Sequence, residues 1–255
     1  MEDKMLEIID HLDSNDITEI STGLELLDVL LRSLLPYIKT YSKLKSKRTS
    51  LQPQRIPQEL NTFIELQDNF QYNITEHLLN IYKLNPIEVN YDTFLITNRL
   101  LQGLLLIHSN SRQLFHRQRN MKLILDLLLI SEDINIELTI SIITTLIHIL
   151  LKDFINYRIF ENLNGCSILI KKFKLTSFDN LKKNQTVNTT SISIDQKNLN
   201  FKIIEFLMFY LTDENVPGND NSTNIKSIKD KSNYFKQDFP EIDDLIQSLN
   251  ELKDL

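Results

Sequence analysis

The sequence predicts an all-α protein built as an armadillo- or HEAT-like helical solenoid. The first observation is a pattern with a spacing of 45 residues, because residues 111–115 (SRQLF) shifted by 45 fall on residues 156–160 (NYRIF). Apolar positions on both sides of these segments coincide after the same shift: Leu101 with Leu146, Leu104 with Ile149, Leu105 with Leu150, Leu123 with Ile168, Ile124 with Leu169, Leu125 with Ile170 and Leu128 with Phe173. A period of about 40–47 residues is typical of such repeats, which bury their apolar faces by stacking.

The second observation is composition. The 255 residues include only four glycines and six prolines, and 42% of them are hydrophobic. This favours long helices over a β-sandwich or a glycine-rich phosphate loop. We expect one helical-repeat domain over residues 1–255, with a flexible insertion at about 176–199 and a polar stretch at about 213–238, where polar residues prevail.

Helical periodicity predicts the elements of the first third of the chain. A helix over residues 2–13 should bury Met5, Ile8, Ile9 and Leu12, and a longer one should follow over about 20–45. The second helix is expected to begin at Ser21 or Thr22 as a cap, with Leu24, Leu27, Leu31, Leu34 and Leu35 on its buried face. Pro36 should kink or split it. A third helix is expected from about Pro57 to Leu84.

The repeat region is predicted over residues 91–175. Its expected helices are 91–108, 111–130 with a break near Arg119-Asn120, 135–152, 154–162 and 165–175. After the insertion, a helix over about 200–211 is apolar nearly all round, which is typical of burial on several sides. An amphipathic helix over 240–253 should close the chain.

Composition also argues against several classes of function. The net charge of −6 gives no general attraction to nucleic acid or to an anionic membrane surface. The single cysteine, Cys166, allows no internal disulfide and fits a reducing compartment. The first residues lack the pattern of a signal peptide, and the apolar runs are too short for a membrane span of about 20 residues. We therefore expect a cytoplasmic protein.

Catalytic and metal-binding patterns are not found in the sequence. The histidines, His11, His77, His108, His116 and His148, show no ligand spacing, and no nucleotide-binding or hydrolase motif occurs. Cys166 could have a lowered thiol pKa in the first turn of a helix, but it aligns with Met121 in the repeat, which favours a packing role. We expect a protein without enzymatic activity, small-molecule substrate, cofactor or metal.

Two clusters of basic residues are candidate sites for binding a partner. The run from Lys39 to Arg48 is interpreted as a solvated linker rather than a nucleic-acid or lipid site. In the second cluster Arg112 is expected to be structural, whereas Arg117 and Arg119 either meet an acidic partner or form a plain solvated surface.

Particular segments resemble the fungal cell division control protein fourteen family. They are residues 100–108 (LLQGLLLIH), 111–115 and 120–128 (NMKLILDLL), with 202–211 (KIIEFLMFYL) similar to the closing helix of the family. The resemblance covers roughly residues 20–214. It concerns the septation-initiation component and not the phosphatase of the same historical name, and Cys166 accordingly has no cysteine-x5-arginine loop.

The resemblance implies a non-catalytic scaffold that binds a germinal-centre-type Ser/Thr kinase. That kinase acts in the cascade that couples mitotic exit to septum formation, and the scaffold is expected to be recruited to the spindle pole body. The alternative is an adaptor at the spindle pole or division site without direct kinase contact. The candidate partner-binding residues are Arg117 and Arg119 and, on the closing helix, Glu205. The insertion at 176–199 is longer than is usual in the family, and Thr212-Asp213-Glu214 replaces its usual Met-Pro-Glu.

Overall fold

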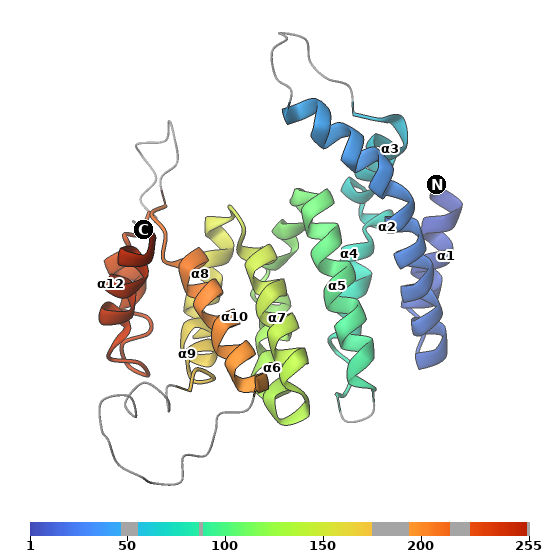
Figure 1. Cartoon of the computed structure of the whole chain (residues 1–255). Helices are drawn as coiled ribbons and strands as arrows, with labels where there is room; N and C mark the ends of the chain where they lie inside the picture. Colours follow the sequence, from blue (N-terminus) through green and yellow to red (C-terminus); the bar gives the residue numbers. More distant parts are fainter. Residues whose placement is uncertain (47–55, 87–88, 175–193, 215–224, 254–255) are drawn as a thin grey trace. The chain divides into compact units, whose positions relative to one another are not determined.

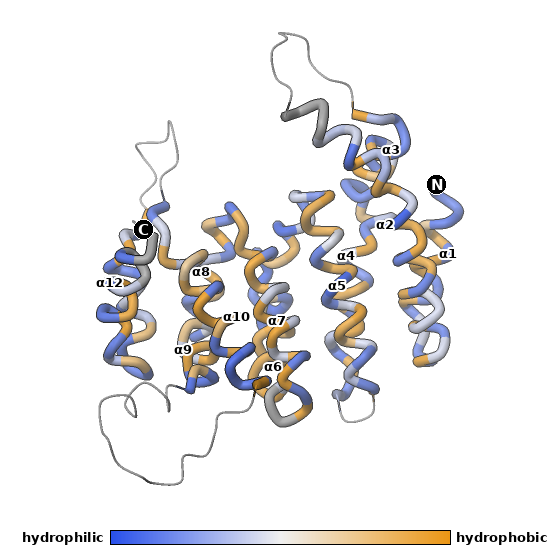
Figure 2. The backbone as a smooth tube through the Cα atoms, in the orientation of Figure 1, coloured by the Kyte–Doolittle hydropathy of each residue, from blue (hydrophilic) through white to orange (hydrophobic). Residues whose placement is uncertain are grey.

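The computed structural model of the chain describes residues 1–46, 56–86, 89–174, 194–214 and 225–253 (Figure 1). Every regular element in these ranges is a helix, which confirms the all-α prediction for the described part of the chain. The chain divides into two compact units, Met1–Leu114 and Phe115–Leu255. Hydrophobic and hydrophilic residues are mixed along the helices of both units (Figure 2), as amphipathic helices around a core require.

The first unit contains the helices from the N-terminus to Leu114, and its last helix extends two residues into the second unit. They are α1 (Glu2–Leu12), α2 (Ile17–Ser46), α3 (Gln58–Asp68), the 3₁₀ helix η1 (Phe70–Tyr72), α4 (Ile74–Ile81), α5 (Tyr91–Ile107) and the 3₁₀ helix η2 (Ser109–His116). Helix α1 packs on α2 and α4, and α2 also packs on α5. The four apolar residues predicted for the buried face of α1 are all buried.

Helix α2 begins earlier than the sequence indicated and continues past its proline. The predicted caps Ser21 and Thr22 lie inside the helix, and Asp16 Oδ1 instead accepts a hydrogen bond from the Thr18 amide at 2.8 Å. Pro36 does not split α2, which runs through it as one curved helix in Figure 1. The proline is exposed, so water can satisfy the carbonyl that lacks an amide partner. Leu35, predicted on the buried face, is exposed too, whereas Leu30, which was not predicted there, is buried.

The predicted helix over residues 57–84 is in fact two helices, α3 and α4, separated by η1. Side-chain amides cause the break. The buried Gln67 donates to the Tyr72 carbonyl at 2.9 Å and accepts from the Ile74 amide at 3.2 Å. Asn73 in turn donates to the Gln67 carbonyl at 2.7 Å. These bonds replace helical backbone bonds, a competition that a hydrophobic pattern does not reveal.

The second unit begins with Phe115. Its helices are α6 (Gln118–Ile134), α7 (Ile136–Leu150), α8 (Phe154–Asn162), α9 (Gly165–Ile170), α10 (Ile194–Tyr210), α11 (Ile228–Ser232) and α12 (Ile242–Lys253). Both α6 and α10 pack on α7, and α8 packs on α9. Within the predicted helix over 111–130, the expected break is present, but it lies at Arg117, between η2 and α6.

The burial predicted from the 45-residue spacing is confirmed for several matched positions. Phe115 and Phe160 are both fully buried, as predicted. Met121 and Cys166, which occupy equivalent positions, are buried as well, as are the matched pairs of α5 and α7. The turns of the two repeats are closed in equivalent ways, because His108 Nδ1 lies 2.8 Å from Ser111 Oγ and Asp153 Oδ1 accepts from the Asn156 amide at 3.1 Å.

Two predicted polar segments are partly helical. Helix α10 begins at Ile194 rather than at about residue 200, so the end of the predicted insertion is helical, and residues 175–193 lie outside the described residues. In the stretch predicted over 213–238, residues 215–224 are likewise outside, but α11 follows, and Lys231 and Phe235 are fully buried. The prediction of one continuous domain stays a prediction.

Gly165 allows the close approach between α8 and α9. A Cβ atom at this position would lie 2.3 Å from two ring carbons of Phe160. That ring cannot move aside, because it is fully buried and packs against the rings of Phe206 and Tyr210 at centroid distances of 5.6 and 6.1 Å.

We therefore expect Gly165→Ala to lower the free energy of unfolding by about 1–3 kcal/mol through overpacking. Gly103→Ala is the matched control, since a Cβ in the middle of α5 would meet only Leu31 Cδ1, at 3.8 Å. Higher helix propensity should stabilise this variant by up to about 1 kcal/mol. Urea denaturation measures both changes, and equal effects of the two substitutions would contradict the steric explanation.

Candidate partner-binding surface

The three residues predicted for partner binding all belong to the second unit, and all are exposed. Arg117 immediately precedes α6, and Arg119 lies in its first turn. Glu205 lies on α10, where it accepts from Lys202 Nζ at 2.7 Å. Helices α6 and α10 each pack against α7.

The electrostatics at the start of α6 are unusual for a helix. Its first turn contains no acidic residue, and Arg117 provides no side-chain cap. The amide groups at a helix start carry partial positive charge, so cations there cost about 0.3–1 kcal/mol each, whereas anions are stabilised. Arg117 and Arg119 thus oppose the helix in which they lie, and an acidic partner would relieve this repulsion.

The other members of this basic cluster are engaged locally. Arg112 donates to the Leu105 carbonyl at 2.8 Å, a bond that supports its predicted structural role. His116 Nε2 lies 2.9 Å from an Asp153 carboxylate oxygen, and Lys122 pairs with Asp126 at 2.7 Å. These three side chains are therefore held by neighbours in the chain's own fold.

A network of buried charges lies elsewhere in the second unit, and the sequence did not predict it. Its members are Arg158, Glu161, Glu214, Lys226 and Lys231. Glu161 and Glu214 are almost completely buried, and Lys231 is fully buried. The one signal in the sequence that could have indicated it is the spacing of Arg158 and Glu161, three residues apart in the predicted helix over 154–162.

The two carboxylates hold this charge cluster together. Glu161 forms an ion pair with Arg158 Nη2 at 3.1 Å, and it accepts from Lys226 Nζ and from the Tyr210 hydroxyl, both at 2.6 Å. Glu214 pairs with Arg158 as well, and it accepts from Lys231 Nζ at 3.1 Å and from the Lys226 amide at 3.0 Å. Residues of α8 and α10 are thereby connected to the segment that contains α11.

Lys231 is the most enclosed cation of the cluster. Its ammonium donates to the carbonyls of Tyr210 and Thr212 at 3.0 and 2.7 Å and lies 5.0 Å from the ring centroid of Tyr157. Burial lowers the pKa of Lys231 despite its bond to Glu214. For Lys226, hydrogen bonds to Glu161 and Tyr234 outweigh the effect of burial, and its pKa is raised. The cluster thus connects the segment that contains α11 to α8 and α10 within the second unit.

The cysteine in this unit is enclosed. Cys166 is buried, and burial raises the pKa of its thiol. This is the opposite of the lowered pKa considered for a cysteine in the first turn of a helix. The side chain packs next to the core, as its alignment with Met121 predicted.

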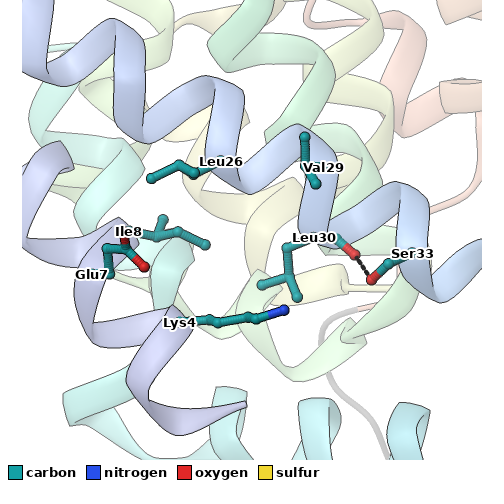
Figure 3. A pocket seen from close by; sticks show the side chains of 7 residues that line it. All are labelled: Lys4, Glu7, Ile8, Leu26, Val29, Leu30 and Ser33. Atoms are coloured by element: carbon teal, nitrogen blue, oxygen red, sulfur yellow. Dashed lines mark hydrogen bonds between the residues drawn. The ribbon is translucent and has the colours of Figure 1, made fainter.

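A small hollow lies between α1 and α2 in the first unit (Figure 3). It has a volume of about 170 Å³ and is lined by Lys4, Glu7, Ile8, Leu26, Val29, Leu30 and Ser33. Apart from the two charged side chains, the lining is mostly apolar, and Ser33 donates to the Leu30 carbonyl at 2.6 Å. The hollow has room for an apolar side chain.

Neither a metal site nor a membrane-spanning helix is found in the described residues. In these ranges no group of three or more His, Cys, Asp or Glu side chains is arranged to hold a metal ion. No helix in the same ranges is long and apolar enough to cross a membrane.

Residues 1–224 match the model of the family described as cell division control protein 14, SIN component. The chain belongs to this family. No curated protein and no solved structure matches the chain. The family match extends the resemblance seen over residues 20–214 to the first helix. It includes Arg158, Glu161 and Glu214 but ends before Lys226 and Lys231, so the charge cluster connects the family region to residues beyond it.

Proposed function

We propose that this chain is a non-catalytic scaffold that binds a germinal-centre-type Ser/Thr kinase during septation. Membership in the family of SIN components, over residues 1–224, is the observation that carries the proposal. The scaffold would stabilise one conformation of the kinase, to the extent that it binds that conformation more tightly than the others, or it would bring the kinase to its place of action. We place this action in the cytoplasm and at the spindle pole body.

We further propose that the repeats stack as in armadillo-like solenoids. The equivalent burial of Phe115 and Phe160, and of Met121 and Cys166, supports this arrangement. Repeat proteins of this kind present extended surfaces to their partners.

The contact with the kinase is proposed to include Arg117 and Arg119. Both arginines are exposed at a helix start where the backbone repels cations, and an acidic segment of the kinase would complement them. Charges at the rim of an interface act mainly on the rate of association and on its dependence on salt.

We expect the double variant Arg117→Glu, Arg119→Glu to associate with the kinase at least about tenfold more slowly at low salt, with a weaker effect at high salt. Its helix content and melting temperature should remain close to those of the unmodified protein, because both sites are exposed. Biolayer interferometry with the purified kinase at several salt concentrations measures the rates.

The matched control is Arg32→Glu, Arg99→Glu, which changes the net charge equally on exposed arginines of the first unit. Equal slowing by both double variants would indicate a general charge effect and contradict the proposed contact. Unchanged association for the Arg117 and Arg119 variant would place the interface elsewhere. If the unmodified protein, folded, binds no kinase of this class, the alternative of an adaptor without kinase contact replaces the proposal.

A further inference from the structure

Helix α10 carries apolar side chains on two opposite sides. Leu199, Ile203, Phe206 and Tyr210 are buried on the side that packs into the second unit. On the other side Ile194, Phe201 and Met208 are 75%, 70% and 40% exposed. Figure 1 shows α10 in orange lying over its neighbours in this unit, so the outer side has no helix of the described part packed upon it in this view.

The three exposed residues form a straight stripe. They are spaced by seven residues, and seven residues rotate an α-helix to within about 20° of two full turns. A stripe with this spacing is typical of helices that pair side by side. A contiguous row of exposed large apolar side chains lowers the solubility of a protein unless a partner covers it.

We propose that this outer stripe of α10 is the interface of a homodimer, in which the helices of two copies run antiparallel. The sequence of α10 is complementary to itself about Phe201. Ile194 lies seven residues before Phe201 and Met208 lies seven residues after it, so a two-fold axis at Phe201 brings Ile194 of one copy level with Met208 of the other.

The charges beside the stripe agree with the same axis. Lys197 precedes Phe201 by four residues, and Glu205 follows it by four. Both side chains are exposed, and a two-fold axis at Phe201 brings Lys197 of one copy level with Glu205 of the other, twice per dimer. Glu205 already accepts from Lys202 on its own helix at 2.7 Å, and its second oxygen can accept from the other copy. Parallel pairing would instead put like charges at the same level.

This arrangement assigns Glu205 to contact between copies rather than to the kinase. The dimer does not depend on the proposed kinase binding, since its assembly is measured on the purified chain alone. One copy has a mass of 30.0 kDa. Sedimentation equilibrium of the full chain should show this mass doubling as the concentration rises.

Phe201→Glu should raise the dissociation constant of the dimer by at least about tenfold, because it buries a charge at the two-fold axis. Phe70→Glu is the matched control, because Phe70 is 85% exposed and lies in the first unit. It should leave the dissociation constant unchanged. Circular dichroism of both variants establishes that they remain folded.

A charge exchange tests the antiparallel register. Lys197→Glu alone and Glu205→Lys alone should each weaken the dimer, and the double exchange should restore it. Weakening without restoration would overturn the register. A monomeric protein at all concentrations up to about 100 μM would overturn the dimer, since an affinity weaker than this leaves little assembly. If the unmodified chain is monomeric and Phe201→Glu still abolishes kinase binding, the stripe belongs to the kinase contact and the dimer is overturned.

Discussion

Replacing Phe160 with alanine is expected to lower the free energy of unfolding by about 3–5 kcal/mol, a large part of the ~5–15 kcal/mol available to a domain. The ring is fully buried and lies among Phe206 and Tyr210, whose own packing prevents collapse around the cavity. Phe115→Ala should have an effect of similar size, since Phe115 is equally buried at the equivalent repeat position. Thermal and urea denaturation followed by circular dichroism measure the change.

Phe70→Ala is the control for the loss of a phenyl ring as such. Phe70 is the most exposed phenylalanine of the described residues, and its replacement should change stability by less than about 0.5 kcal/mol. If Phe160→Ala unfolded no more easily than Phe70→Ala, the packing of Phe160 against α10 would contribute little to the free energy of unfolding. The importance predicted for this repeat position would then be wrong.

The second large effect is expected in the buried charge cluster. Arg158, Lys226 and Lys231 provide three positive charges and Glu161 and Glu214 two negative ones, which leaves a net charge of +1. Glu214→Gln keeps the shape of the side chain but raises this buried charge to +2. We expect a loss of about 3–5 kcal/mol, as found when one partner of a buried ion pair is removed.

Lys231→Met provides the comparison, because it leaves the cluster neutral. The methionine fills most of the space of the lysine, and the loss consists mainly of the hydrogen bonds to Glu214 and to the carbonyls of Tyr210 and Thr212. We expect a cost of about 1–3 kcal/mol. Urea denaturation of both variants gives the order of the two effects. A larger cost for Lys231→Met than for Glu214→Gln would show that net charge does not govern the stability of the cluster.

Part of the candidate site could be predicted from residue types and spacing. Arg117, Arg119 and Glu205 are charged residues that the sequence analysis expected at the surface, and all three are exposed. The ion pair between Glu205 and Lys202 could not be predicted from the sequence, because it depends on the rotamers of both side chains. The apolar outer stripe of α10 was interpreted as burial on several sides, since a sequence does not distinguish a covered apolar side from an exposed one.

The sequence by itself determined that the described part of the chain is helical and which apolar residues form much of its core. Apolar spacing and the 45-residue register are local properties, and they correctly placed Phe115 and Phe160 in the core and the limits of α8 at residues 154–162. Only the tertiary structure decided where polar side chains interrupt or complete that pattern. Gln67 ends a helix through its amide bonds. Lys231 becomes buried because Glu214 and two backbone carbonyls, 17 to 21 residues away, surround its ammonium group. Burial of a charge depends on partners distant in sequence, and hydrophobic periodicity carries no information about them.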